Sequence, residues 1–205
     1  MNQKERMLAG LPYQAWRDGL AEERIAVKKK TQAYNMVCSG ERDRREELVR
    51  QILGKAGKRV HIESPFQCDY GWNIEVGDYF YANHNLIILD VGKVTIGDNV
   101  MFATNVSILT AGHPIHPEAR NSGYEYGIPI TIGNNVWLGG NVVVNPGVTI
   151  GDNAVIGAGS VVTKDIPANV IAAGVPCKII REITEDDKKY YYRDREFDID
   201  YSIND

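Results

Sequence analysis

The stretch that decides the fold runs from Ile130 to Ile166 and reads ITIGNNVWLGGNVVVNPGVTIGDNAVIGAGSVVTKDI. A branched aliphatic residue recurs in it every six positions, at Ile132, Leu138, Val144, Ile150, Ile156 and Val162. A second apolar or small residue follows each of these four positions later, at Val136, Val142, Val148, Ala154, Ser160 and Ile166. An amphipathic helix repeats about every 3.6 residues and a half-buried strand about every two. A period of six therefore indicates a solenoid, in which short strands alternate with corners.

Each repeat is predicted to form one short strand whose aliphatic side chain points inward, followed by a corner. The residue after the aliphatic is small or polar each time, as at Gly133 and Gly151, and we expect it to adopt the unusual backbone angles of a corner. Three repeats would close one triangular coil, and stacked coils would pair their strands in parallel. The pattern continues upstream at Ile96, Phe102 and Ile108 and, after a two-residue insertion near Val91, at Val76, Ala82 and Ile88. The expected fold class is thus an all-β solenoid.

The segments on either side of the repeats lack this pattern. An N-terminal helical segment, residues 1–58, is predicted to contain one helix from Ala21 to about Cys38 and a second that starts after Gly40. The solenoid is predicted over residues 59–183, interrupted by a long loop at about 111–130. In the C-terminal segment, residues 184–205, Thr184–Asp187 resembles a capping box and predicts a short helix through Tyr190–Tyr192, followed by an acidic tail. We expect both terminal segments to cover the open ends of the coil stack.

Composition restricts the functional classes. The net charge of −4 gives no reason to expect nucleic acid as a partner. No apolar run is long enough to cross a bilayer, and the first residues lack the apolar segment of a secretory signal, so we expect a cytoplasmic location without membrane contact. Cys38, Cys68 and Cys177 are odd in number and widely spaced, which argues against a disulfide framework and a structural zinc site. All three are expected to be buried and inert.

Function must be argued from the residues that depart from the repeat pattern of small and aliphatic residues, because a solenoid by itself implies no activity. The repeat stops at Thr110–Pro114, and polar residues occupy a repeat at Tyr81–Asn85. Trp137 is a large aromatic in an otherwise slim motif. A basic edge follows at Lys164, Lys178 and Arg181.

Together these motifs resemble the galactoside and maltose O-acetyltransferases. The shared set consists of Tyr-x-Asn at 81–83, Thr-Ala-Gly-His-Pro at 110–114, Pro-Ile-x-Ile-Gly-Asn-Asn-Val-Trp at 129–137, Val-Thr-Lys-Asp-Ile-Pro at 162–167, Ala-Gly-Val-Pro-Cys-Lys at 173–178 and the opening Met7-Leu8-Ala9-Gly10…Tyr13. The resemblance covers nearly the whole chain. It implies a left-handed parallel β-helix and a cytoplasmic homotrimer with its sites between subunits. The implied activity is acetyl transfer from acetyl-CoA to a sugar hydroxyl, with no metal.

The catalytic residues implied by the resemblance are His113, Asn83 and Trp137. A sugar hydroxyl is a poor nucleophile, and an imidazole can take its proton during attack on a thioester and return it to the leaving thiolate. His113 matches the family's catalytic His, whereas His116 is interpreted as a loop or acceptor-side residue. Asn83 would bond the acceptor or the reacting oxygen, and Trp137 would pack near the thioester. The structural alternatives are a loop His, an Asn in a corner ladder and an aromatic at a subunit contact.

Two further sets would bind the substrates. The set that matches the acetyl-CoA track consists of Trp137, Gly140, Ala158, Thr163, Lys164, Lys178 and Arg181. Small residues there would let the ligand lie against the backbone, and the basic ones would meet phosphate oxygens. The acceptor set consists of Asp69, Tyr81, Asn83 and Glu125, where Glu125 would orient either the acceptor or His113. Val91 and Ala15 stand where galactoside enzymes can carry acidic residues, so the resemblance does not extend to galactoside specificity.

Three other readings stay open at this point. Zinc-dependent hydration on the same fold needs three converging His ligands, but the four His of this chain are His61, His84, His113 and His116, with none in the later coils. A non-catalytic scaffold would need the coils but not His113, Asn83 and Trp137 together. An acetyltransferase for serine, an amino sugar or a xenobiotic is the third, although the serine and amino-sugar enzymes lack the opening at Met7–Gly10 and the xenobiotic enzymes usually differ in the long loop and the termini.

Overall fold

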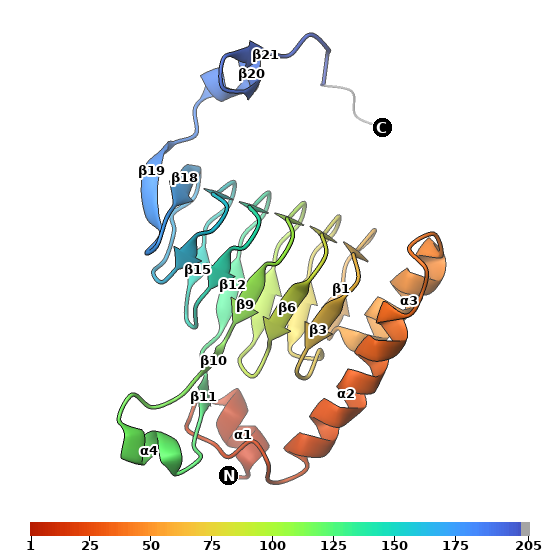
Figure 1. Cartoon of the computed structure of the whole chain (residues 1–205), viewed down its shortest axis with the longest axis vertical. Helices are drawn as coiled ribbons and strands as arrows, with labels where there is room; N and C mark the ends of the chain where they lie inside the picture. The colour runs from red at the N-terminus through yellow and green to blue at the C-terminus, as the bar shows by residue number, and fades with distance from the viewer. Residues whose placement is uncertain (202–205) are drawn as a thin grey trace.

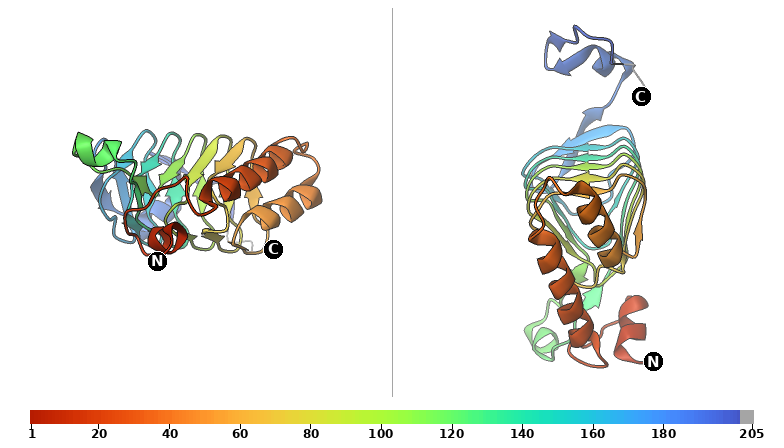
Figure 2. Two further views of the ribbon diagram at one scale, coloured as in Figure 1. Left: turned by 90° about the horizontal axis from the view of Figure 1, so that it is seen from below. Right: turned by 90° about the vertical axis from the view of Figure 1, so that its right-hand side faces the viewer.

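The computed structural model of the chain describes residues 1–201 and shows a triangular prism of stacked coils, with two helices, α2 and α3, at one end (Figures 1 and 2). The helices are α1 Gln3–Leu8, α2 Leu20–Asn35, α3 Arg42–Ile52, α4 Pro117–Asn121 and the 3-10 helix η1 Glu185–Lys189. The strands are β1 Lys55–Ala56, β2 His61–Ile62, β3 Phe66–Cys68, β4 Ile74–Val76, β5 Tyr81–Ala82, β6 Leu86–Leu89, β7 Val94–Ile96, β8 Met101–Phe102, β9 Ser107–Leu109, β10 Ala111–Gly112, β11 Tyr126–Gly127, β12 Ile130–Ile132, β13 Trp137–Leu138, β14 Val143–Val144, β15 Thr149–Ile150, β16 Val155–Ile156, β17 Val161–Val162, β18 Val170–Ala173, β19 Lys178–Glu182, β20 Tyr190–Tyr192 and β21 Arg195–Glu196.

Three sheets form the walls of the prism. We name them the first sheet, β1-β4-β7-β12-β15, the second sheet, β2-β5-β8-β13-β16-β18-β19, and the third sheet, β3-β6-β9-β14-β17. Their pairings are parallel except for the final one, β18 with β19. The chain passes from the first sheet to the second, then to the third and back. The second corner joins the second and third sheets, and the third corner joins the third sheet to the first.

The core follows the six-residue repeat. Ile132 pairs with Ile96 on one side and with Ile150 on the other, so each coil places its aliphatics directly on those of its neighbours. The six repeating aliphatics from Ile132 to Val162 are at most 1% exposed, and the second set from Val136 to Ile166 is buried as well. The predicted repeat and its inward face are therefore confirmed.

The reason for the small residues at the corners differs from the prediction. Gly133 and Gly151 do not have a positive φ. A Cβ on Gly133 would lie 2.2 Å from Asp152 Oδ1, and one on Gly151 would lie 2.5 Å from the backbone nitrogen of Ala168, so these positions are small because successive coils approach closely there. The left-handed conformation belongs instead to Asn residues further along two of the three corners, such as Asn153 at φ 61°.

These Asn residues bond to one another along the corners of the stack. One row runs Asn85, Asn105 and Asn141, with amide hydrogen bonds of 2.9 and 3.1 Å, and the other runs Asn135, Asn153 and Asn169, at 2.9 and 2.7 Å. Asn83 is not a member of either row, since its side-chain oxygen accepts from the backbone of His84 at 2.7 Å. The ladder explanation therefore does not apply to Asn83.

Helices α2 and α3 lie across the open end of the first coil (Figure 2, right), as expected for the N-terminal segment. They begin and end within a few residues of the predicted bounds. Val27 and Tyr34 of α2 and Val49 and Ile52 of α3 are buried in the same core as the strands. This packing shields apolar surface and strand ends that would otherwise be exposed.

The predicted loop at about 111–130 leaves the third corner and contains structure of its own. Strands β10 and β11 pair antiparallel at its base, and the short helix α4 lies at its tip, where His116 is the residue just before the helix. The loop also contacts the opening of the chain, because Tyr13 and Glu125 exchange backbone hydrogen bonds of 2.9 and 3.0 Å.

The C-terminal segment differs from the prediction in two ways. The capping box at Thr184 is present but opens only the short η1, because Tyr190–Tyr192 form strand β20, paired with β21, instead of continuing the helix. After β19 the chain leaves the prism (Figure 1), so this segment does not cover the end of the coil stack as expected. The final part of the predicted acidic tail, residues 202–205, lies outside the described residues.

The three thiols differ in exposure. Cys68 and Cys177 are buried, and burial raises the pKa of both. Cys38 is exposed, contrary to expectation, because it lies in the connection between α2 and α3. Within residues 1–201, no helix combines the length and apolarity needed to cross a membrane.

Replacing Gly97 with Ala should destabilise the chain, because the new Cβ would lie 2.8 Å from the backbone carbon and oxygen of Gly133 in the next coil. Overpacking of this kind costs about 1–3 kcal/mol. The matched control is Gly40→Ala, where a Cβ meets nothing within 4 Å. Thermal unfolding should show a lower midpoint for Gly97→Ala only; equal midpoints would contradict the close-approach explanation.

Candidate active site

The sequence-predicted site residues fall on two separate edges of the prism. Those at the third corner are Asp69, His113, Glu125, Thr163 and Lys164, which follow strands of the third sheet or belong to the excursion loop. Those on the second sheet or at the second corner are Tyr81, Asn83, Trp137, Gly140, Ala158, Lys178 and Arg181. The chain therefore holds these candidate residues in two separate groups, which we call the two candidate half-sites.

At the third corner, His113 is paired with a carboxylate. Its Nε2 lies 3.9 Å from Glu125 Oε2, and the imidazole is 55% exposed while the Glu125 side chain is 19% exposed. Tyr13 donates its hydroxyl hydrogen to Glu125 Oε1. The loop thus offers an accessible imidazole beside a carboxylate that a second residue holds in place.

Tyr13 is fully buried, in a small apolar cluster with Met7, Leu20, Tyr70 and Val91. Burial and the neighbouring Glu125 carboxylate raise the pKa of its phenol, so it stays a hydrogen-bond donor. Val91 belongs to this cluster and Ala15 packs against it, so both positions serve apolar packing. Asp18 accepts from the Gln3 backbone at 2.7 Å and so fastens α1.

Asp69 follows β3 and is partly buried beside the same cluster. Burial raises the pKa of Asp69, while Arg24 and Lys28 oppose that shift. Its backbone, and that of Tyr70, donate to Asp90 Oδ1 at 2.9 Å each. Arg24 in turn donates to the Tyr70 hydroxyl at 2.6 Å and to the Ala15 carbonyl at 2.8 Å. This part of the third corner is thus tied to α2 and to the opening segment.

Asp90 is fully buried beneath this corner. Its Oδ2 has no hydrogen-bond partner among the residues that the structure describes. Burial raises the pKa of Asp90 to about 6, and the two backbone donors on Oδ1 only partly offset it. The carboxyl is therefore a structural anchor that carries an electrostatic cost when ionised.

On the second sheet, Tyr81 and Trp137 point outward from strands separated by β8, where both pair with Met101. They are 37% and 49% exposed. Asn83 stands at the second corner, and Gly140 and Ala158 occupy later turns of the same corner. At Gly140 an added Cβ would meet only Thr104, at 3.4 Å from its Oγ1 and 3.5 Å from its backbone oxygen. Few side-chain atoms therefore surround this position.

The basic residues lie toward the C-terminal end of the prism. Lys164 is exposed just after β17, and Lys178 and Arg181 belong to β19, whose residues are all exposed. Arg181 donates to both oxygens of Asp187 at 2.6 and 2.8 Å, and this pair raises the pKa of Arg181. A phosphate would have to compete with Asp187 for that guanidinium.

Three residues of this region had no role in the sequence predictions. Tyr13 was visible within the opening motif, but nothing in the sequence paired it with Glu125. Arg24 lies on a charged helix, where it resembles any solvated residue. Asp90 follows a strand residue and is distinguished only by its burial. The partners of all three are distant along the chain, so only the structure reveals these contacts.

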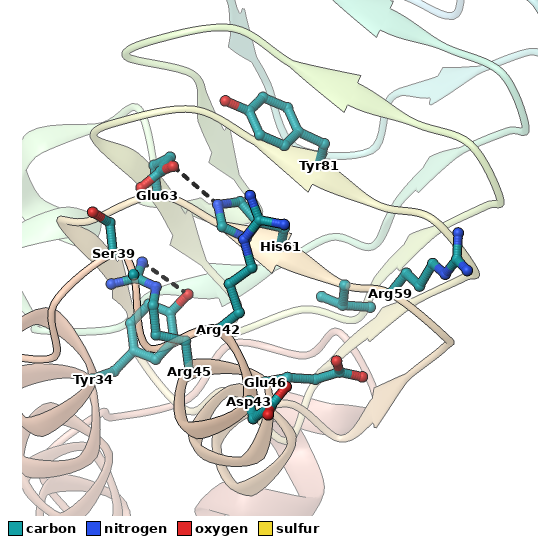
Figure 3. A pocket seen from close by; sticks show the side chains of 12 residues that line it. Tyr34, Ser39, Arg42, Asp43, Arg45, Glu46, Arg59, His61, Glu63 and Tyr81 are labelled. Atoms are coloured by element: carbon teal, nitrogen blue, oxygen red, sulfur yellow. Dashed lines mark hydrogen bonds and ion pairs between the residues drawn. The ribbon is translucent and has the colours of Figure 1, made fainter.

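One cleft lies apart from His113, which is not among its lining residues. It has a volume of about 840 Å³ and lies between the start of α3 and the second sheet, with Tyr81 in its lining (Figure 3). Residues 1–201 contain no cluster of three or more His, Cys, Asp or Glu side chains placed to hold a metal ion.

Comparison with known proteins places this geometry in a family. Residues 6–57 match the model of the maltose acetyltransferase hexapeptide capping motif, and residues 129–164 match that of the bacterial transferase hexapeptide, six repeats. Over 194 residues the chain is 51% identical to galactoside O-acetyltransferase of Escherichia coli (strain K12), covering 95% of this chain and 96% of that protein. The chain belongs to the galactoside and maltose O-acetyltransferase family. It is an acyltransferase.

Solved structures of relatives superimpose closely on the prism. A maltose O-acetyltransferase from Clostridium difficile 630 is 54% identical with a TM-score of 0.89, covering 90% of this chain and 99% of that one. A galactoside acetyltransferase in complex with coenzyme A is 48% identical with a TM-score of 0.92, covering 97% and 100%. The fold is the left-handed parallel β-helix of the hexapeptide-repeat acetyltransferases, as the resemblance implied.

The raised pKa of Asp90 predicts a pH-dependent loss of stability. A carboxyl with a raised folded pKa keeps its proton when the unfolded chain releases it, so stability falls as pH rises from about 4 to about 6. A shift of roughly two pKa units corresponds to a loss of about 3 kcal/mol in the free energy of unfolding, and this loss is complete above pH 6. In Asp90→Asn the side-chain oxygen still accepts both backbone bonds, and no charge forms.

We therefore expect Asp90→Asn to unfold at a higher temperature than the original chain at pH 8 and at a similar temperature at pH 4, as followed by circular dichroism. Parallel pH profiles for the two proteins would show that Asp90 does not titrate in this way.

Proposed function

We propose that this chain transfers an acetyl group from acetyl-CoA to a hydroxyl of a sugar, with His113 as the general base. The observation that carries the proposal is the pairing of the exposed His113 imidazole with the Glu125 carboxylate, itself held by Tyr13. Two solved relatives support the co-substrate, since one is titled as a complex with coenzyme A and another, from Vibrio cholerae, as a complex with acetyl coenzyme A.

The proposed reaction is a direct transfer in a ternary complex. The acceptor oxygen attacks the thioester carbonyl while the His113 imidazole takes the hydroxyl proton. The carboxylate of Glu125 stabilises the resulting imidazolium. The carbon–sulfur bond then breaks, and the imidazolium returns the proton to the thiolate. Asn83 would bond the acceptor or the reacting oxygen, and Trp137 would pack near the thioester.

This chemistry needs both half-sites, which one subunit holds on different edges. We propose that the third corner of one subunit faces the second sheet of the next, so that His113 lies opposite Trp137 and Asn83 of its neighbour. A heterologous contact of this kind closes into a ring when the rotation permits, and three subunits make the homotrimer predicted from the resemblance. The cytoplasmic location stays a prediction.

The cofactor and acceptor would approach from opposite ends of this contact. Gly140 and Ala158 would let the pantetheine arm lie against the second corner, with Thr163 and Lys164 supplied from the facing corner. Lys178 and Arg181 would meet the phosphates, Arg181 after exchange with Asp187. The acceptor would contact Asp69, Tyr81, Asn83 and Glu125. Relatives are named for galactoside and maltose, and a neutral sugar fits the mixed polar lining on this side.

His113→Ala should lower kcat by about 100-fold or more, since loss of a general base typically costs 10²–10⁴. Thermal unfolding should be unchanged, because the side chain is exposed. The matched control is His116→Ala, three residues further along and also exposed, which should retain near-normal turnover. Activity would be followed as free thiol released from acetyl-CoA with a panel of sugars. An unimpaired His113→Ala enzyme would remove the assignment.

Lys164→Ala should raise KM for acetyl-CoA by about 10-fold with little change in kcat, because a hydrogen bond to a charged group contributes about 1.5–3 kcal/mol and this lysine is exposed. Lys189→Ala serves as the control, since that lysine forms a salt bridge with Asp186 within the C-terminal segment. Initial rates over a range of acetyl-CoA concentrations measure the effect. If KM stays the same in Lys164→Ala, the phosphate role is wrong.

A further inference from the structure

The cleft of about 840 Å³ has no role in the reaction described above. Its floor is the outer face of the second sheet, with His61 from β2 and Tyr81 from β5. Its opposite wall is the connection before α3 and the first turns of that helix, with Ser39, Arg42 and Glu46. Arg42 extends from the start of α3 into this space (Figure 3). A volume of this size falls within the range of ligand pockets, about 300–1,000 Å³.

The cleft adjoins the half-site that contains Asn83. Strand β2 pairs in register with β5, so His61 lies beside Tyr81. One step further, Glu63 donates its backbone hydrogen to Ala82 at 2.8 Å and therefore stands next to Asn83 in the neighbouring coil. A ligand that touches Asn83 and Tyr81 at its reacting end can thus extend over Glu63 and His61 into the cleft.

Part of the lining is rigid. The guanidinium of Arg45, which is 3% exposed, donates to the carbonyls of Val37 and Ile62 at 3.0 and 2.6 Å and to Ser64 Oγ at 2.9 Å. It also lies over the Tyr34 ring, 4.5 Å from its centre. These bonds fix the inner wall, so the cleft is preformed and a ligand need not order it.

The floor offers an aromatic surface with charged neighbours. The rings of His61 and Tyr81 stack with centres 5.6 Å apart and planes within 4° of each other. His61 Nε2 lies 3.0 Å from Glu63 Oε1, and this bond lowers the pKa of Glu63, which stays an ionised acceptor. A ring with C–H groups on one face and hydroxyls on its rim can lie on such a surface and bond to its edges.

The charges of the lining are balanced. The cations Arg42, Arg45 and Arg59 stand against the anions Asp43, Glu46 and Glu63. This balance favours neither a phosphate nor a cation. An apolar group would have to desolvate these charges without replacing their hydrogen bonds, which is costly. A neutral, hydroxyl-rich group can supply both donors and acceptors.

We propose that this cleft binds the non-reacting sugar ring of an oligosaccharide acceptor, while the reacting ring lies at Asn83 and Tyr81 opposite His113 of the neighbouring subunit. This inference rests on the proposed function and extends it, because it assigns the second ring to residues outside the acceptor set. It also predicts that the residues at the start of α3 influence acceptor size without touching the reacting atoms.

The test compares a disaccharide with its own monosaccharide. For maltose and glucose, kcat/KM is measured with the original chain and with Ser39→Trp, which fills the cleft from its rim, and Arg42→Ala, which removes a hydrogen-bonding wall. Both positions are exposed, so folding should be retained in at least one variant. The matched control is Arg44→Ala, an exposed residue of the same helix that does not line this cleft.

Both cleft variants should lower the maltose-to-glucose ratio of kcat/KM by about 10-fold, whereas Arg44→Ala should leave the ratio unchanged. An unchanged ratio in folded Ser39→Trp and Arg42→Ala, with acetyl transfer to both sugars intact, would overturn the cleft assignment and leave the proposed function standing. No acetyl transfer to any sugar by the original chain would overturn both proposals.

Discussion

The whole structure depends on the close contact between successive coils at their corners. An added Cβ on Gly97 or Gly133 would lie within 3 Å of atoms in the next coil, so the stack exists only because side chains are missing there. That contact holds the short strands in register and places each aliphatic on the next. A strand of two residues has few hydrogen bonds of its own, so its stability comes from this stacking.

The same regular stack explains where the chemistry is located. Inward positions are committed to the core, so functional side chains can occur only on outer faces, at corners or in insertions. The proposed site uses all three, with Trp137 on a face, Asn83 at a corner and His113 in an insertion. Because these residues lie on different edges of one prism, the proposed chemistry calls for a second copy of the chain rather than a movement within the first.

The sequence was sufficient for the solenoid, since a six-residue period matches neither a helix nor a single strand, and its motifs were distinctive enough to nominate candidate site residues, whose roles stay predictions. It was misleading where the outcome depends on distant contacts. Gly133 looks like a turn residue, yet its role is close approach. Tyr190–Tyr192 follow a true capping box, yet pair with Arg195–Glu196 as a strand. Tyr13 and Glu125, more than a hundred residues apart, could not be paired from local pattern.

Mixed trimers test most directly whether each active centre joins His113 of one subunit to the second sheet of another, as we propose. His113→Ala and Trp137→Ala subunits, each strongly impaired alone, would be unfolded together in equal amounts and refolded. If the two half-sites come from neighbouring subunits, random mixing restores about one quarter of the centres and of the original activity. Activity no higher than that of the two separate variants would place both residues in one subunit's site and contradict the claim.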